Sequence, residues 1–405
     1  MAAPAWEEVA VAATERTPPR RLGSIVAAAL SLPGLVASPA MAETAPEKGS
    51  IALKYLYYKD FQKVEANYPG ETRPAQEKFE RIRVKSPSVQ IVVPIGSEWS
   101  VEAGATVDEV SGATPTYYSS VSGATKSPGG MSDYRKAGDV KVTRHFHRAA
   151  VAVGLGSSSE HDFESNALAV EGRLASEDNN TTWHAGVGAT RDRIGSSDDP
   201  TLDERRRTNE GMVGVTRVLT ANDVVQVNVG YRHGRGYFSD PYKAFDRRPD
   251  TRRQGTVLTR WNHHVASLGS TVRSSYRFYK DSFGISAHTV EAAWVQPFGD
   301  LWSLTPSVRY YTQSAARFYC DPSPDVLVFP GCAGSPAYST VDQRMSAFGA
   351  LTLGIKLQVR WDDWTGDVKY ERYTQKSGLR AGGGGSPGLD PLFADIVQLG
   401  VSKSF

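Results

Sequence analysis

The chain has 405 residues, 40% of them hydrophobic, and its 46 basic and 44 acidic side chains leave a net charge of +2. This balance argues against a nucleic-acid partner, which calls for a basic excess or a basic patch. The mean hydropathy of −0.38 is ordinary for a soluble protein, but a membrane barrel with alternating apolar and polar residues has a similar average.

The N-terminal residues predict a signal peptide. Arg20 and Arg21 precede the apolar run SIVAAALSLPGLVA, and Ala-Met-Ala at 40–42 supplies the small residues of a cleavage site. We place cleavage after Ala42, so the domains are a signal peptide at 1–42 and a barrel at 43–405. No later run of 18 apolar residues exists, so no membrane-spanning helix is expected.

The rest of the chain repeats segments of about ten residues in which apolar and polar side chains alternate, which is the period of a β-strand. Helical periodicity is absent. Sixteen strands are expected, near 51–61, 81–95, 99–109, 136–147, 149–158, 166–175, 182–191, 209–219, 223–233, 255–264, 270–280, 287–296, 301–313, 344–357, 364–374 and 393–405.

The connections between these strands alternate in length. Short ones are expected at 96–98, near Arg148, and at 176–181, 220–223, 266–269, 297–300 and 358–363, and long ones at 62–80, 110–135, 159–165, 192–208, 234–254, 314–343 and 375–392, with 281–286 as a brief exception. This pattern predicts an all-β fold: a transmembrane antiparallel β-barrel of about 16 strands, with short periplasmic turns and long extracellular loops. A Gram-negative outer membrane is the expected location.

Aromatic residues support the barrel. All seven tryptophans after the signal peptide lie within a few residues of a short turn, whereas tyrosines gather near the long loops, at positions 57, 58, 231, 237, 276, 279, 310, 311 and 373. Two aromatic girdles would explain this segregation. The final strand ends on Phe405, which we expect to serve as an assembly signal for the barrel-assembly machinery, as in outer-membrane barrels in general.

Strand alternation assigns charged side chains of both signs to the barrel interior. The expected pore-lining residues are Arg232, Arg273, Arg277, Arg309, Glu171, Arg173, Glu291, Asp367, Lys369 and Glu371. Sixteen strands enclose room for an aqueous channel. The arginines would then favour anionic solutes, or the charges would pair with one another as a network that fills the barrel; the sequence leaves both open.

Other candidate sites carry weaker signals. Cys320 and Cys332 are close in an exported chain and predict a loop disulfide. His145 and His147 share a strand face and are weak metal candidates, although an ordinary polar lining explains them better, so no metal and no cofactor is expected. His161, His233 and His288 with Asp240 and Asp281 lack a nucleophile pattern, so no enzyme is expected.

The long connection 234–254 is rich in charge. It would fold into the lumen as a constriction, bind lipopolysaccharide phosphates through Arg247, Arg248, Arg252 and Arg253, or simply form a solvated charged loop. Membrane lipid and lipopolysaccharide are therefore expected partners.

Several stretches resemble a family of exported proteobacterial proteins that is catalogued as a domain of unknown function. They are SEDNNTTW, GRGYFSDPYK, RWNHH, DSFGISAHT, WVQPFGD, RYYTQSAARFY and DQRMSAFGALTLG. The resemblance implies a gene neighbourhood with a small lipoprotein and a thioredoxin-like protein. Two functions are thus expected as alternatives: a channel for small polar or anionic solutes, and a non-conducting barrel that scaffolds a periplasmic redox or lipoprotein partner.

Overall fold

The computed structural model describes residues 44–63, 78–112, 125–127, 130–196, 199–241, 246–321 and 337–405. Within these ranges the secondary structure is β-strand, apart from two single turns of 3-10 helix at Gln343–Met345 and Ser377–Leu379. No helix in this part of the chain is long and apolar enough to cross a membrane. The expected signal peptide at 1–42 lies outside the described residues.

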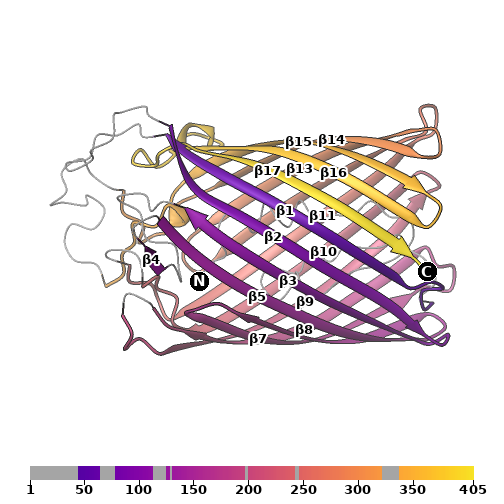
Figure 1. Cartoon of the computed structure of the whole chain (residues 1–405), viewed down its shortest axis with the longest axis horizontal. Coiled ribbons are helices and arrows are strands. Elements are labelled where there is room, and N and C mark those ends of the chain that lie inside the picture. Colours follow the sequence, from indigo (N-terminus) through magenta and orange to yellow (C-terminus); the bar gives the residue numbers. More distant parts are fainter. Residues whose placement is uncertain are drawn as a thin grey trace.

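The strands form one closed antiparallel sheet (Figure 1). They are β1 (Ser50–Lys63), β2 (Lys78–Ile95), β3 (Trp99–Gly112), β4 (Thr125–Ser127), β5 (Gly130–His145), β6 (Ala149–Ser159), β7 (Phe163–Ala175), β8 (Thr181–Ile194), β9 (Glu204–Thr220), β10 (Asp223–Gly236), β11 (Thr251–Val265), β12 (Ser270–Asp281), β13 (Ser286–Phe298), β14 (Trp302–Gln313), β15 (Phe348–Trp361), β16 (Trp364–Lys376) and β17 (Leu392–Ser404).

The barrel closes between β1 and β17, which lie side by side in Figure 1 and pair in register from Ser50–Ser404 to Gln62–Leu392. Backbone hydrogen bonds extend the seam by one residue, because Gly49 and Phe405 donate to each other's carbonyl at 2.9 and 3.0 Å. In the described part of the chain, every long strand of the wall therefore pairs on both sides, which is what a sheet in hydrocarbon requires. The three-residue β4 pairs with β5 alone, so the wall has 16 strands, as the sequence predicts.

The turns at one end of the barrel are short because several contain a residue with positive φ. Gly96, Gly269 and Gly299 have φ of 58–62°, and Asn179 and Asp362 have φ of 54° and 47°. Such residues let two strands reverse within a few positions, and asparagine and aspartate tolerate this region better than other side chains. The alternating turn lengths expected from the sequence are therefore largely confirmed.

Several expected boundaries are wrong, and three of them show why. The connection expected at 159–165 is reduced to 160–162, because β6 and β7 extend further than their alternating segments indicate. The turn expected at 358–363 shrinks to Asp362 and Asp363, since β15 continues to Trp361. That strand also begins at Phe348 rather than near 344, because Asp342 caps a 3-10 turn over Gln343–Met345.

The outer surface of the barrel carries an apolar belt. Fifteen of the wall strands each expose a large apolar side chain to the outside: Leu53, Val93, Val140, Val153, Leu168, Val187, Val213, Val229, Val257, Tyr276, Val290, Val308, Leu353, Val368 and Leu399. Soluble monomers rarely expose a continuous apolar surface of this extent, whereas lipid-facing barrels require one.

Tryptophans border this belt at the short-turn end, as expected. Trp99, Trp183, Trp261, Trp302, Trp361 and Trp364 are 38–59% exposed. The expected tyrosine girdle at the other end is only partly present. Tyr231 and Tyr276 face outward, but Tyr58 and Tyr373 are 5–6% exposed and join an apolar cluster on the inner face with Ile82, Val84, Ala350, Leu392, Ala394 and Ile396.

Candidate functional site: the charged barrel interior and its closure

One wall of the barrel interior carries an excess of positive charge. Strand alternation turns six arginines of β10–β14 inward, against two carboxylates, Asp281 and Glu291. The arginines are Arg232, Arg252, Arg260, Arg273, Arg277 and Arg309. Glu291 lies directly across from Arg309 in the β13–β14 register, and Arg273 and Arg277 lie opposite the uncharged Ala293 and Thr289. The wall therefore combines two acid–base neighbour pairs, Arg309 with Glu291 and Arg252 with Asp281, with a surplus of guanidinium groups.

The predicted interior residues on other strands lie in mixed-charge surroundings. Lys369 contacts Glu371 at 2.9 Å on β16, and Asp367 lies 3.8 Å from Lys356 on β15. On β10, Arg232 is 3.5 Å from Glu210 of β9. Glu171 and Arg173 share the inner face of β7. The structure thus brings at least four of the ten predicted residues into ion pairs, and all ten occupy inward positions.

Sequence reasoning missed a buried interior pair. The Lys141 ammonium lies 2.7 Å from the Glu102 carboxylate, and both side chains are less than 8% exposed. Arg135 similarly contacts Asp108 at 2.5 Å between β3 and β5. Glu102, Asp108 and Lys141 lie in the expected strands 99–109 and 136–147, whereas Arg135 precedes the second of them. Their pairing was not recoverable, because the register of β3 against β5 depends on the long connection between the two strands.

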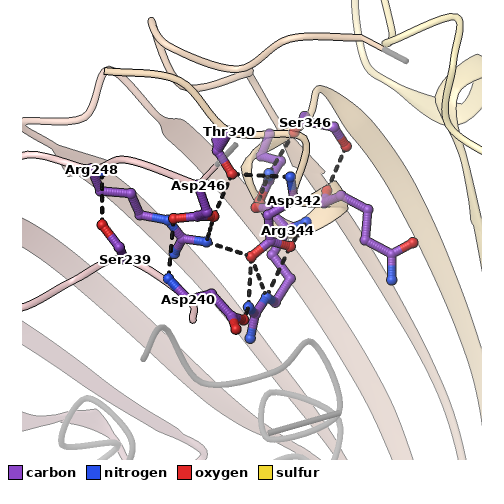
Figure 2. Close-up of polar contacts among 10 residues, drawn as sticks. Ser239, Asp240, Asp246, Arg248, Thr340, Asp342, Arg344 and Ser346 are labelled. Atoms are coloured by element: carbon purple, nitrogen blue, oxygen red, sulfur yellow. Dashed lines mark hydrogen bonds and ion pairs between the residues drawn. The ribbon is translucent and has the colours of Figure 1, made fainter. Parts of the chain in front are cut away.

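A second buried network joins two loops at the long-loop end (Figure 2). The Arg248 guanidinium contacts Asp246 at 2.6 Å and Asp342 at 2.7 Å, and all three side chains are at most 1% exposed. Arg344 contacts Asp240 and Asp342, each at 2.6 Å. We call this five-residue group the clasp, because it joins the loop after β10 to the loop before β15, residues almost a hundred positions apart.

Backbone contacts and apolar packing support the clasp. Arg247 and Ser339 form an isolated antiparallel bridge with N–O distances of 2.7 and 2.9 Å. Phe238, Phe283 and Met345 form an apolar cluster with Ile285 and Ala316 in the same loops. Burial alone would lower the pKa of Arg248, but Asp246 and Asp342 outweigh this effect and hold the pKa above its ordinary value. Arg248 therefore stays positively charged at the centre of the clasp.

Two further arginines form buried ion pairs on the inner face of the barrel, at the strand ends near the long loops. Arg206 contacts Asp192 at 2.7 Å, and its guanidinium lies over Phe163 and Phe238. Arg252 contacts Asp281 at 2.6 Å and lies over Phe283. Guanidinium groups stacked on aromatic rings and paired with carboxylates lose little by burial. Ion pairs between strand ends and between loops therefore stabilise the long-loop end.

These contacts overturn part of the prediction for the 234–254 connection. Arg248 and Arg252 do not face solvent or lipid phosphate, because each is buried and bound to aspartate. Arg247 and Arg253 are exposed. Asp240 and Asp281, considered as catalytic acids, contact Arg344 and Arg252 instead.

The remaining candidate residues give mixed results. His145 and His147 do not share a strand face, since β5 ends at His145 and His147 is exposed in the following turn. His145 Nε2 lies 2.9 Å from Ser100 Oγ. Within the described residues no group of three metal-ligating side chains occurs. Cys320 is 1% exposed, but Cys332 lies outside the described residues, so the disulfide stays a prediction.

The chain matches the sequence profile of one protein family. The family is described as "Protein of unknown function (DUF3570)", and its profile matches residues 22–203 and 196–395. The chain belongs to this family, which confirms the resemblance noted from the sequence. No curated protein matches the chain.

Solved structures with a partial similarity to the chain include two siderophore receptors and a secretin. The siderophore receptor PirA from Pseudomonas aeruginosa is 10% identical, with a TM-score of 0.46, and the match covers 85% of this chain and 61% of the receptor. PirA from Acinetobacter baumannii is 11% identical with a TM-score of 0.43, covering 85% and 54%. A bacterial polysaccharide outer membrane secretin is 11% identical with a TM-score of 0.43, covering 87% and 98%. The chain spans less than two thirds of these receptors' length, and such low similarity transfers no substrate.

Proposed function

We propose that this chain is an outer-membrane pore for small polar solutes, with a preference for anions. The observation that carries the proposal is the uneven charge of the interior, where six arginines on β10–β14 face two carboxylates. Charged rings in a channel concentrate ions of opposite sign and set selectivity. The paired charges on β3, β5, β15 and β16 neutralise one another, so the arginine wall would dominate the field in the channel.

The proposal includes a location and an orientation. The apolar belt would face the lipid of a Gram-negative outer membrane, with the tryptophan border and the short turns on the periplasmic side. Residues 1–42 would be removed on export. Phe405 would be read by the barrel-assembly machinery; its ring lies so close to Gly49 that a Cβ there would be 2.5 Å from a ring carbon.

The clasp favours one alternative function. Arg248 and Asp342 join two loops at the long-loop end. If these loops block that end of the barrel, the barrel would not conduct. Such a barrel would instead scaffold a periplasmic redox protein or a small lipoprotein. The two functions differ in one observable, which is steady conductance.

The test is single-channel conductance of residues 43–405 refolded into a planar bilayer. We expect a steady conductance with anion preference, and a shift toward cations in Arg273→Glu because one interior cation becomes an anion. Arg217→Glu is the matched control, since Arg217 is exposed on the outer face of β9 and its charge reversal leaves the interior unchanged. A folded barrel that never conducts would rule out the pore and favour the scaffold.

A further inference from the structure

A row of arginines crosses the outer surface of the barrel near its long-loop end. Arg191, Arg207 and Arg235 lie directly opposite one another on β8, β9 and β10. Arg193 and Arg205 form a second opposed pair, one step closer to the loops. With Arg253 on β11, these make a patch of six exposed, outward-facing guanidinium groups, which we call the arginine patch.

The arginine patch has too few carboxylates to neutralise it. Asp203 contacts Arg193 at 2.8 Å, and Glu164 lies opposite Arg193 in the β7–β8 register. In the described part of the chain, no side-chain ion pair joins Arg191, Arg207 or Arg235 to an acid. Like charges directly opposite on neighbouring strands destabilise a sheet. Three arginines in one row therefore point to an anion that lies between them in the native setting.

The opposite side of the barrel provides an internal comparison. There β1, β2 and β16 also carry outward cations near the long loops, and three of them lie beside an acid, whereas Lys376 lies over the Phe393 ring. Lys59 contacts Glu80 at 2.7 Å, Arg83 contacts the same carboxylate at 2.5 Å, and Arg372 contacts Asp395 at 2.6 Å. Lys59, Arg83 and Arg372 are thus neutralised within the sheet on that side. On β8–β10 the anion that neutralises the arginines would come from outside the chain.

The height of the arginine patch on the barrel identifies what it faces. On β8 the outward residues are Trp183, Ala185, Val187 and Ala189, and Arg191 follows. Eight residues at about 3.3 Å each span roughly 26 Å along the strand, or roughly 20 Å of height at a tilt of about 40°. An apolar band is about 25 Å tall. The backbone of the row thus lies roughly 5 Å inside the edge of such a band, and the long arginine side chains reach from there to the headgroups.

We propose that the arginine patch binds the phosphate groups of lipid A, the phosphorylated headgroup that anchors lipopolysaccharide in the outer leaflet. Guanidinium groups bind phosphate oxygens in pairs of hydrogen bonds. Val187, Val213 and Val229, exposed on the same three strands, provide the apolar surface for acyl chains. A soluble anion would gain nothing from that surface. This inference rests on the proposed outer-membrane location and is independent of whether the lumen conducts.

The test uses the full barrel purified from membranes in detergent, and the probe is lipid A with both phosphates. Binding is measured by native mass spectrometry for the wild type and for a variant with Arg191→Gln, Arg207→Gln and Arg235→Gln. We expect at least a roughly tenfold loss of affinity, because charge-assisted contacts to phosphate are lost. Arg217→Gln, an exposed outward arginine at the other end of β9, is the control and should bind as the wild type does.

Two further probes separate lipid from free anion. Dephosphorylated lipid A should bind much more weakly than lipid A, and inorganic pyrophosphate should not match the affinity of lipid A. Equal affinity of the triple variant and the wild type would overturn the proposal, as would equal binding of the dephosphorylated lipid or of pyrophosphate. If the triple variant does not assemble, as judged by heat-modifiable gel mobility, Arg207→Gln alone decides, with the same direction expected. If lipid A binding fails these tests while anion conductance is intact, the lipid A proposal is wrong and the proposed pore is unaffected.

Discussion

Removal of one clasp arginine should open the long-loop end without unfolding the barrel. Arg248→Ala leaves the Asp246 and Asp342 carboxylates, both 0% exposed, without a guanidinium that lies 2.6–2.7 Å from each. Breaking a buried ion pair from one side costs about 3–5 kcal/mol, because the remaining charge stays buried. At about 1.36 kcal/mol for each factor of ten, clasp opening should become roughly a hundred to several thousand times more frequent.

Amide hydrogen exchange measures this opening directly. The Arg247 and Ser339 amides donate to each other's carbonyl across the clasp, so their exchange rates report whether the two loops are joined. Both rates should rise by the factor above, while amides in the middle of the strands stay protected. Arg193→Ala is the matched control. It removes an exposed arginine–aspartate pair, which solvent screens, and should leave these amides unchanged.

A rise of less than about tenfold at both amides would refute the assignment of clasp stability to its buried charges. The apolar cluster around Phe283 would then contribute most of the free energy that holds the two loops together. A double variant, Arg248→Met with Asp246→Asn, tests the same reasoning from the other direction. It removes a charge of each sign and should exchange more slowly than Arg248→Ala alone, because fewer buried charges are left without a partner.

Two other predictions follow from the outer surface and from a close loop contact. Leu399→Arg places a charge on the apolar belt and should cost about 2–4 kcal/mol in urea unfolding from lipid vesicles if the position lies near the midplane; Leu399→Ala is the control, and unchanged stability would contradict the outward assignment of β17. Gly349→Ala should displace the loop at Leu379, because a Cβ at Gly349 would overlap the Leu379 carbonyl. The loss is about 1–3 kcal/mol, with faster exchange of the Arg380 amide that closes the Ser377–Leu379 turn. Gly172→Ala, where a Cβ meets nothing within 4 Å, is the matched control, and equal effects of the two substitutions would refute the overlap.

Periodicity was enough to predict the barrel wall, because a strand that separates lipid from a polar interior must alternate at every position. β8 illustrates this, since every outward residue from Trp183 to Ala189 is apolar or small and every neighbour faces inward. Alternation also contained information that the tyrosine prediction did not use. Tyr57 and Tyr58 are adjacent, so they had to face opposite sides, and Tyr58 is indeed buried.

The clasp could not be predicted from the sequence. Arg248 and Asp342 are 94 residues apart, in loops without periodicity, and nothing local indicates that they meet. The same lack of local signal made Arg248 and Arg252 look like exposed phosphate ligands. The short β4 was missed because three residues are too few to show alternation. Long-range pairing of charges in irregular segments depends on loop paths that composition does not specify.

The seam between β1 and β17 has a consequence for the order of folding events. Neighbouring strands elsewhere in the wall follow one another along the chain, so each can pair soon after it emerges. β1 instead finds its second partner at residues 392–404. Until the last strand arrives, the growing sheet has two free edges, and free edges recruit other chains. Closure is therefore a single late event in which both aggregation-prone edges disappear together, and a chain that stalls before β17 would keep both of them exposed.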